Sequence, residues 1–250
     1  MASTAGWTHR LILLALLVPG ALPHPVAAQS TDCILDNCAD KRPPMPQEGT
    51  RVALPRGSGR PGDFDFYVLS LSWSSGFCET ASGARTHAQC DSGAGLGFVV
   101  HGLWPQYEKG YPTECGPSGR SPSRIALEGA QGLYPDEGLA RYEWRKHGTC
   151  SGKSPTDYFA DVRKARDAIV IPLPFQGARA NQTWTPLDIE RAFMGANPRL
   201  RPGMLGIACV KGVLREVRIC FSKDLRDFHA CPEIGREGCH AREISVPPAL

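Results

Sequence analysis

The stretch FDFYVLSLSW, residues 64–73, is apolar on both of its alternating faces. A strand with one solvated face alternates apolar and polar residues, whereas a strand buried on both faces is almost continuously apolar. The stretch therefore predicts an inner strand of a sheet. Residues 98–100, FVV, predict a second, short strand that ends next to His101.

The residues at helix ends indicate three helices. Residues 154–157, SPTD, combine an N-cap serine, a proline at the first helical position and an acid in the first turn, and residues 185–188, TPLD, repeat this pattern. The second of these helices is expected to end before the Asn-Pro step at residues 197–198, because a proline disfavours a helical residue in front of it. Residues 138–148, GLARYEWRKHG, predict a further helix that the final glycine ends.

The C-terminal part of the chain predicts a hairpin. Residues 204–210 and 213–221 are rich in apolar residues and flank a Lys-Gly pair at 211–212, which indicates a tight turn. Strands and helices thus come in clusters and not in strict alternation, which favours an α+β fold. We interpret residues 62–250 as one domain, because no repeat or second type of composition follows. The preceding residues 29–61, rich in Pro, Gly and Arg, indicate an irregular segment.

Composition limits the classes of protein to which the chain can belong. It has 250 residues, of which 42% are hydrophobic and 21% are charged, which is ordinary for a globular protein and excludes global disorder. The net charge of +3 is only mildly basic. A protein that binds nucleic acid by bulk charge usually carries much more, so nucleic-acid binding would depend on a specific site.

The first 28 residues have the pattern of a secretory signal peptide. Arg10 supplies the positive region, residues 11–18, LILLALLV, the apolar region, and residues 26–28, VAA, a small-residue cleavage site. The apolar run is too short to cross a bilayer. An N-terminal core helix is the alternative, but three prolines crowd the end of the run. We therefore expect residues 1–28 to be removed, and the mature protein to be secreted or periplasmic without attachment to a membrane.

The cysteines support the same compartment. All ten follow the predicted cleavage site, and their even number is expected for five disulfides in an exported protein. Their spacing alone leaves the pairing open. The alternative, structural zinc, is disfavoured because no CxxC pair occurs and the closest cysteines, Cys33 and Cys38, have no adjacent histidine. The sequence therefore predicts no metal site.

Two segments carry side chains suited to proton transfer. On the helix predicted over 138–148, Glu143, Lys146 and His147 share one face because they are three and four residues apart. His101 follows the short strand and is expected at a turn, together with a nearby tryptophan. Taken singly, each segment has a simpler interpretation. The first is then a solvated helix face with an intrahelical Glu–Lys pair, and the second a core histidine beside a packing tryptophan.

Together, the two histidines, the lysine and the carboxylate fit one reaction, the attack of a neighbouring hydroxyl on a phosphodiester. One imidazole removes the hydroxyl proton, and the other, protonated, donates a proton to the leaving oxygen. Lys146 would neutralise charge on the phosphorane oxygens. RNA carries such a hydroxyl at its 2′ position and DNA does not. Trp104 would offer a face on which a base can stack.

The same segments resemble a known family. FVVHGLWPQ at residues 98–106 and YEWRKHGTCSG at residues 142–152 closely resemble the two active-site segments of the ribonuclease T2 family. GDFDFYVLSLSW followed by GFC, within residues 62–78, looks like the N-terminal strand of that family and is most like its bacterial ribonuclease I branch. The resemblance extends roughly from Gly62 to Cys239, which is most of the chain after the predicted cleavage site.

The resemblance implies a metal-free ribonuclease without a cofactor. His101 matches the histidine that protonates the departing 5′-oxygen, and His147 matches the base that activates the 2′-hydroxyl. Glu143 and Lys146 match residues that stabilise the transition state, and Trp104 matches an aromatic residue that lines a base site. The family cleaves single-stranded RNA through a 2′,3′-cyclic phosphate to 3′-phosphate ends. We expect low base specificity, no action on DNA and a monomeric protein.

The resemblance also implies the architecture, an α+β fold with a central antiparallel sheet, flanking helices and disulfides that staple them together. From the cysteine pattern of the family we expect three disulfides, Cys115–Cys150, Cys209–Cys239 and Cys220–Cys231. For the four remaining cysteines we expect the pairs Cys78–Cys90 and Cys33–Cys38.

Two positions depart from the pattern of the family. Tyr142 stands where many eukaryotic members have a phosphate-binding histidine, and a tyrosine can donate a hydrogen bond to phosphate but carries no positive charge. Gln106 stands where some relatives have an acid at a second base-site position, and its amide both donates and accepts hydrogen bonds. We expect both residues to contact the substrate. The sequence does not determine which base the protein prefers.

Other functions fit the residues less well. A metal-dependent nuclease needs a carboxylate cluster, and the nearest acids, Asp63 and Asp65, are typical of the polar rim of a strand. A hydrolase with Cys150 as nucleophile needs a free thiolate, which a disulfide excludes. A secreted binding protein that keeps the fold without turnover is the main alternative, although such a protein would usually have lost His101 or His147.

Overall fold

The computed structural model describes residues 59–81, 88–91, 95–116 and 121–250. The predicted signal peptide, the predicted pair Cys33–Cys38 and most of the predicted irregular segment over 29–61 lie outside the described residues. Among the described residues, no helix combines the length and the apolar character needed to cross a membrane.

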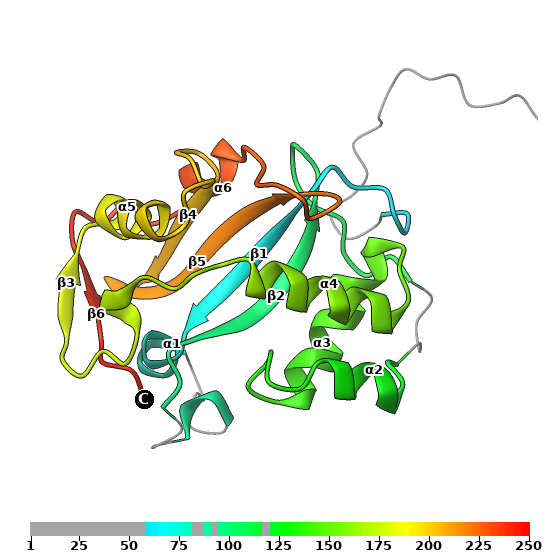
Figure 1. Ribbon diagram of the computed structural model, residues 1–250, viewed down its shortest axis with the longest axis horizontal. Helices are drawn as coiled ribbons and strands as arrows, with labels where there is room; N and C mark the ends of the chain where they lie inside the picture. Colours follow the sequence, from blue (N-terminus) through cyan, green and yellow to red (C-terminus); the bar gives the residue numbers. More distant parts are fainter. Residues whose placement is uncertain (1–58, 82–87, 92–94, 117–120) are drawn as a thin grey trace, which may run out of the picture. The chain divides into compact units, whose positions relative to one another are not determined.

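A six-stranded sheet lies at the centre of the described part of the chain (Figure 1). Its order is β2-β1-β5-β6-β3, and β4 also pairs with β5. The pairings of the described strands are antiparallel except for one parallel contact, between Val213 and Ser245, so the sheet predicted as antiparallel is mixed at this end. The strands are β1 (Phe66–Trp73), β2 (Phe98–Gln106), β3 (Gln182–Trp184), β4 (Leu205–Val210), β5 (Val213–Ser222) and β6 (Ile244–Val246).

Helices flank this sheet, and the α+β fold predicted from the sequence is confirmed. Figure 1 shows α2, α3 and α4 grouped beside β2, and α5 and α6 beside β4. The helices are α1 (Ser74–Thr80), α2 (Arg124–Gly129), α3 (Glu137–Lys146), α4 (Pro155–Asp167), α5 (Pro186–Ala196) and α6 (Pro232–Arg236).

β1 is the inner strand that its sequence predicts. All eight of its residues are buried, and it pairs with β2 on one side and β5 on the other. At its end the Trp73 ring packs against Phe98, with 4.9 Å between ring centroids. Removal of so much apolar surface from water is the main stabilising contribution to a fold of this kind. β1 thereby provides a rigid support for the strands beside it.

The helix caps and the hairpin also follow the predictions. The Ser154 side chain accepts a hydrogen bond from the Asp157 N–H at the start of α4, and Thr185 does the same for Asp188 at the start of α5. β4 and β5 form the predicted antiparallel hairpin. Both residues of its turn, Lys211 and Gly212, have positive φ, which a two-residue turn between twisted strands requires.

Four disulfides staple the described residues, and they join the cysteines that were expected to pair. Two of them hold the hairpin and the chain that follows it, and another joins the residues after β2 to the short 3₁₀ helix that follows α3. The pairs are Cys78–Cys90, Cys115–Cys150, Cys209–Cys239 and Cys220–Cys231.

One helix ends earlier than expected. α3 ends before His147, which leaves the helix with φ −121°, and the chain continues as a short 3₁₀ helix over Gly148–Ser151. The glycine with left-handed backbone is Gly152, at φ 74°. The helix thus ends two residues before the predicted bound, and Gly148, the residue after the C-cap, lacks the positive φ that is typical of a glycine that ends a helix. A glycine is needed there for packing, because a Cβ would lie 2.4 Å from Cε3 of Trp144.

Candidate active site

A β-bulge presents His101. β2 runs on to Gln106, so this histidine and Trp104 lie within a strand and not at the turn that was predicted. The turn was wrong because pairing with β1 continues on both sides of the histidine, where Ser70 faces Gly102 and Leu71 faces Val100. His101 is the extra residue between these pairs. A bulge of this kind redirects a side chain out of the regular alternation.

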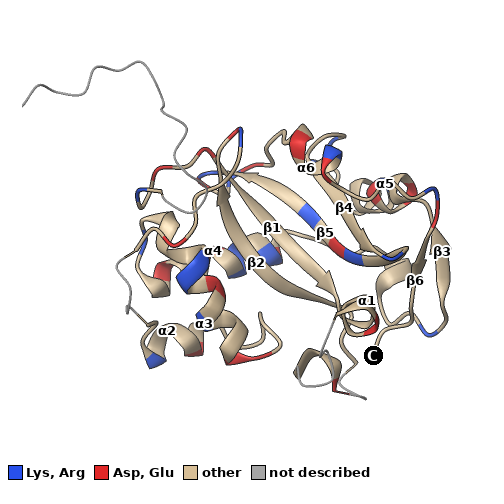
Figure 2. Cartoon of the chain, turned by 180° about the vertical axis from the view of Figure 1, so that it is seen from behind, with Lys and Arg blue, Asp and Glu red and all other residues tan. Residues whose placement is uncertain are grey.

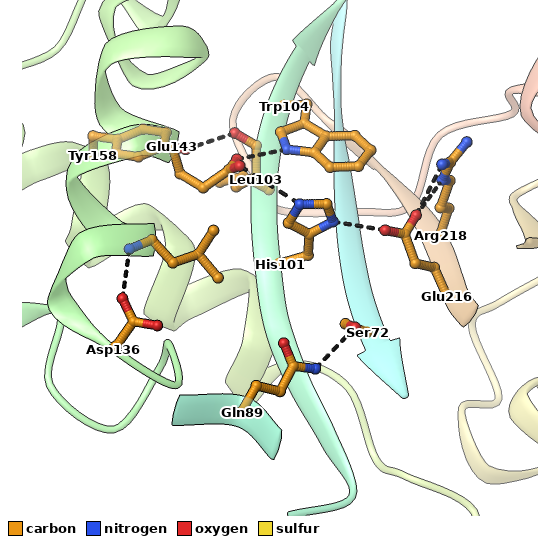
Figure 3. A network of polar contacts seen from close by, with 11 residues as sticks. Ser72, Gln89, His101, Leu103, Trp104, Asp136, Glu143, Tyr158, Glu216 and Arg218 are labelled. Carbon is orange, nitrogen blue, oxygen red and sulfur yellow. Dashed lines mark hydrogen bonds and ion pairs between the residues drawn. The ribbon is translucent and has the colours of Figure 1, made fainter. Parts of the chain in front are cut away.

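Two carboxylates lie on opposite sides of the His101 ring (Figure 3). Nδ1 is 2.6 Å from Oε1 of Glu216 on β5, and Nε2 is 3.7 Å from Oε1 of Glu143 on α3. The second oxygen of Glu216 accepts a hydrogen bond from Nε of Arg218 at 2.9 Å and forms an ion pair with Nη2 of the same residue at 2.8 Å. The imidazole is thus held between the sheet and a helix.

Trp104 connects the parts of the site. Its Nε1–H donates to Oε2 of Glu143 at 2.8 Å. Its ring centroid is 5.2 Å from that of His101 and 5.3 Å from that of His147. Gly102 leaves room for this contact, since a Cβ there would lie 2.1 Å from Glu143 Oε2 and 2.2 Å from Trp104 Nε1. The two predicted histidines therefore contact one indole ring.

α3 supplies the acid, the lysine and the second histidine. Glu143 and His147 are buried, with exposed fractions of 1% and 5%. The His147 N–H donates to the Glu143 carbonyl at 2.9 Å, which fixes the histidine against the last turn of the helix. Lys146 is half-buried, and its Nζ lies 5.4 Å from the centre of the Tyr142 ring. A solvated helix face does not bury a carboxylate and an imidazole, so this simpler interpretation of the segment is wrong.

Cross-links hold α3 beside β2. Cys115–Cys150 joins the chain after β2 to the 3₁₀ helix, and the Glu114 N–H donates to the Lys146 carbonyl at 2.8 Å. From α4, the hydroxyl of Tyr158 donates to the Leu103 carbonyl at 2.9 Å. These contacts fix the distance between the strand that carries one histidine and the helix that carries the other.

The surroundings shift the pKa values of the two histidines in opposite directions. Burial by itself lowers the pKa of His101, but the hydrogen bond to Glu216 and the charges of Glu216 and Glu143 outweigh it, so the pKa is raised. Burial, followed by the positive charges of Lys146 and His101, lowers the pKa of His147 to about 3. Near neutral pH the site therefore pairs one imidazole poised to donate a proton with one that is free to accept it.

The two carboxylates also differ. Burial raises the pKa of Glu143 to about 7, although His101, the hydrogen bond from Trp104 and the charge of Lys146 act in the opposite direction. Burial by itself raises the pKa of Glu216 too, but His101 and Arg218 outweigh it and lower the pKa to about 2. Glu216 is thus a permanent anion, whereas Glu143 can donate or accept a hydrogen bond near neutral pH.

The other two predicted substrate residues, Tyr142 and Gln106, line two different cavities. One, of about 370 Å³, is lined by His101, Tyr142 and Asp136, among others. The other, of about 420 Å³, is lined by Gln106 and by Tyr111, and Gln106 also donates to the Pro105 carbonyl at 3.1 Å. The structure therefore places Tyr142 beside the histidine and Gln106 in a different cavity.

The two acids that a metal-dependent nuclease would have needed, Asp63 and Asp65, lie just before β1, as expected for the polar rim of a strand. Asp65 accepts a hydrogen bond from the Glu108 N–H at 3.0 Å, at the start of β1. In the ranges that the structure describes, no group of three His, Cys, Asp or Glu side chains is arranged to hold a metal ion.

Sequence reasoning missed Glu216 and Arg218. They belong to β5, whose register places them opposite Ser72 and Ser70 of β1. Of the six described strands, only β5 contains charged residues, and Figure 2 shows both signs of charge in its middle. A charged pair inside a strand predicted to be apolar was the available signal, because a buried charge needs a partner.

Comparisons with known proteins point to one family. The family model described as "Ribonuclease T2 family" matches residues 64–231. A ribonuclease of Aeromonas hydrophila is 37% identical over 192 residues, which cover 71% of this chain and 81% of that protein. The solved structure of an RNase-related protein from Calystegia sepium covers 75% of this chain and 98% of its own, with a TM-score of 0.60 at 23% identity. RNase NT in complex with 5′-AMP covers 74% and 99%, with a TM-score of 0.52 at 23% identity.

Proposed function

The chain belongs to the ribonuclease T2 family, and we propose that it cleaves single-stranded RNA by attack of the ribose 2′-hydroxyl, without a metal ion or a cofactor. The observation that carries this proposal is the pair of imidazoles, His101 and His147, with opposite pKa shifts on one indole ring. Acid–base catalysis of a phosphoryl transfer needs these two protonation states at once.

In the first step, His147 removes the proton of the 2′-hydroxyl, and the oxygen attacks the neighbouring phosphorus. The bond from phosphorus to the 5′-oxygen breaks while His101 donates a proton to that oxygen. The products are a 2′,3′-cyclic phosphate and a free 5′-hydroxyl. In the second step a water molecule loses its proton to His101 and attacks phosphorus, His147 returns a proton to the 2′-oxygen, and a 3′-phosphate results.

The negative phosphodiester itself prepares this site. The pKa of His147, about 3 in the empty site, suits a base poorly at neutral pH. A bound anion beside an imidazole favours its protonated form and so raises the pKa of both histidines. The substrate therefore makes His147 a stronger base and keeps His101 protonated.

Lys146 and Glu143 stabilise the charge that develops on the phosphorane oxygens. The hydrogen bond with Tyr142 is the main cause that raises the pKa of Lys146, so the ammonium stays charged. Glu143, with a pKa of about 7, donates a hydrogen bond when protonated. Tyr142 carries no charge, but the cations of Lys146 and Arg145 lie 5.4 Å and 5.9 Å from the centre of its ring. These two cations supply the positive charge that a histidine at this position would provide.

The two cavities support a role in holding bases. The one beside His101 is closest to the reacting phosphate, and Tyr142 lines it. The other carries three acids, Glu108, Glu233 and Glu237, so a neutral base fits it better than a phosphate does. Trp104 offers an aromatic ring near both histidines for stacking, which tolerates every base, so we propose low base specificity.

We also propose that the protein acts outside the cytoplasm, in the periplasm or the medium. The signal-peptide pattern of residues 1–28 and the four disulfides support this location.

The test is cleavage of a single-stranded oligoribonucleotide by the purified, fully oxidised protein in excess EDTA, with the new ends identified by mass spectrometry. We expect cyclic phosphate first and 3′-phosphate later, with a matched deoxyoligonucleotide left intact. Cleavage that EDTA abolishes, or that yields 5′-phosphate ends, would contradict the mechanism. A folded protein that cleaves nothing would instead support a binding protein with the same fold.

A further inference from the structure

We propose that Glu216 is a positioning residue for His101, and that Arg218 holds Glu216 in place. The carboxylate fixes the imidazole with a proton on Nδ1 and leaves Nε2 to exchange protons with the RNA. This inference rests on the proposed function, because His101 is the proton donor in it.

The geometry of the contact carries the first step. The 2.6 Å between His101 Nδ1 and Glu216 Oε1 is short for a hydrogen bond from a nitrogen to a carboxylate, as expected when both groups are charged. His101 sits in a bulge, where the regular ladder does not determine the direction of its side chain. A hydrogen bond from β5 therefore supplies the constraint that the strand itself lacks.

Arg218 completes the arrangement. It binds Oε2 of Glu216 through two nitrogens, so each carboxylate oxygen has its own partner. Its guanidinium carbon also lies 5.5 Å from the centre of the Trp104 ring. Arg218 thus holds the Glu216 carboxylate on the side away from His101. The positive charge of the arginine also offsets the cost of burying the carboxylate.

A stabilising role alone explains this pair poorly. Buried ion pairs often contribute little to stability compared with apolar residues of the same size, and the described strands that pair with β5 contain no Asp, Glu, Lys or Arg. The pair nevertheless lies where one of its oxygens reaches Nδ1 of His101. A histidine whose other nitrogen is bound by a carboxylate has a defined tautomer and a defined orientation.

Groups on several elements act on the charge of His101. Glu216 and Arg218 face it from β5, Glu143 faces it from α3, and Asp136 and Tyr142 line the same cavity. His147 contacts the same indole ring as His101. Since Glu143 is 3.7 Å from Nε2 and Glu216 is 2.6 Å from Nδ1, Glu216 makes the stronger contact with the ring.

The main experiment compares wild type with Glu216→Gln, which keeps the shape and removes the charge. We expect kcat to fall about 10- to 100-fold, the range typical of groups that orient a histidine, with KM nearly unchanged. We also expect the basic limb of the kcat/KM profile to move to lower pH, because His101 loses its proton more easily. Glu128→Gln is the matched control, because Glu128 forms an exposed ion pair with Arg124. It should change neither kcat nor the pH profile of kcat/KM.

A second readout is independent of turnover. Nitrogen-15 NMR of the histidine rings should show Nδ1 of His101 protonated across the neutral range in wild type. In Glu216→Ala the ring should favour the other tautomer and titrate at lower pH. If wild-type His101 carries its proton on Nε2 alone, or if folded Glu216→Gln keeps the wild-type rate and pH profile, the proposal is wrong.

The two proposals fail in different ways. A wild-type protein that cleaves no RNA, yet shows the bound Nδ1 proton and loses it in Glu216→Ala, would contradict the ribonuclease mechanism and keep the positioning role. A protein with the expected products and an unaffected Glu216→Gln variant would keep the mechanism and overturn the positioning role.

Discussion

His101 and His147 contact the same tryptophan but occupy opposite surroundings. His101 projects from the sheet between two carboxylates, is half-buried, and has a raised pKa. His147 follows α3, is buried, neighbours the positive Lys146, and has a pKa lowered to about 3. One fold thus shifts the pKa values of two identical side chains in opposite directions, through the charges nearby and the water excluded around them, as the proposed roles of proton donor and proton acceptor require.

Among the substitutions that test this difference between the two histidines, removal of either imidazole should have the largest effect. We expect His101→Ala and His147→Ala each to lower kcat by about a thousandfold or more, because in the proposed mechanism each imidazole transfers a proton in both steps. Since the two act as a unit, the double variant should lose little more than either single variant. The measurement is kcat on one oligoribonucleotide, with circular dichroism to show that the fold is kept. Substantial activity in a folded single variant would remove the two-histidine mechanism.

Loss of the Cys115–Cys150 disulfide should loosen the end of α3 that carries His147. We expect replacement of both cysteines by serine to cost about 2–5 kcal/mol of unfolding free energy, measured with denaturant. The pKa of His147 should rise toward its ordinary value, because water reaches the ring. Replacement of Cys209 and Cys239 by serine is the control, since it should cost similar stability and leave the pKa of His147 unchanged. Equal changes in the pKa of His147 in both variants would show that the Cys115–Cys150 disulfide has no local role.

The charge next to His147 can be removed alone. We expect Lys146→Ala to lower kcat about a hundredfold by loss of transition-state stabilisation. We also expect the acid limb of the pH profile to move to higher pH, because a positive charge that disfavours protonated His147 is gone. Arg141→Ala, one turn earlier and paired with Glu137, is the control. A rate unchanged in Lys146→Ala would make the lysine a residue of the helix surface only.

The sequence predicted the parts of the molecule that depend on local patterns. The apolar run of β1, the caps at Ser154 and Thr185, and the Lys-Gly turn of the hairpin each follow from neighbouring residues. The spacing of Glu143 and the histidine after it placed both on one side of a helix. The family resemblance supplied three of the four described disulfides, which spacing alone left open, and it suggested the roles that we propose for the site residues.

What the sequence did not predict depends on contacts between distant strands. The bulge at His101 exists only because β1 pairs with β2 in one register on each side of it. Glu216 lies 115 residues from His101 and reaches it only because both strands pair with β1. The need for a glycine at residue 148 likewise depends on the folded chain, where a Cβ would lie 2.4 Å from Cε3 of Trp144. Such features arise from tertiary structure and leave no local periodicity.

The opposite surroundings also predict opposite effects of pH on stability. His147 has a folded pKa of about 3, below the ordinary 6.5, so between these values the unfolded chain binds a proton that the folded chain does not. Its presence therefore lowers the unfolding free energy as pH falls through this range, by up to about 1.4 kcal/mol per pH unit. His101 has a raised pKa, so its contribution is complete below pH 6.5 and is lost as pH rises through the folded value.

Urea unfolding of wild type, His147→Asn and His101→Asn between pH 3 and pH 8 measures these two effects as differences between curves. The His147→Asn curve should be flatter than wild type on the acid side. The His101→Asn curve should lose the fall in stability that wild type shows above pH 6.5, and it should also change on the acid side, because His101 lowers the pKa of Glu216. The range above pH 6.5 therefore reports on the imidazole of His101, and the difference between wild type and His147→Asn on the acid side reports on the imidazole of His147 to the extent that its neighbours keep their contacts. If His147→Asn changed the curve only above pH 6.5, as expected for His101, the two histidines would share one environment, and the division into donor and acceptor would have no electrostatic basis.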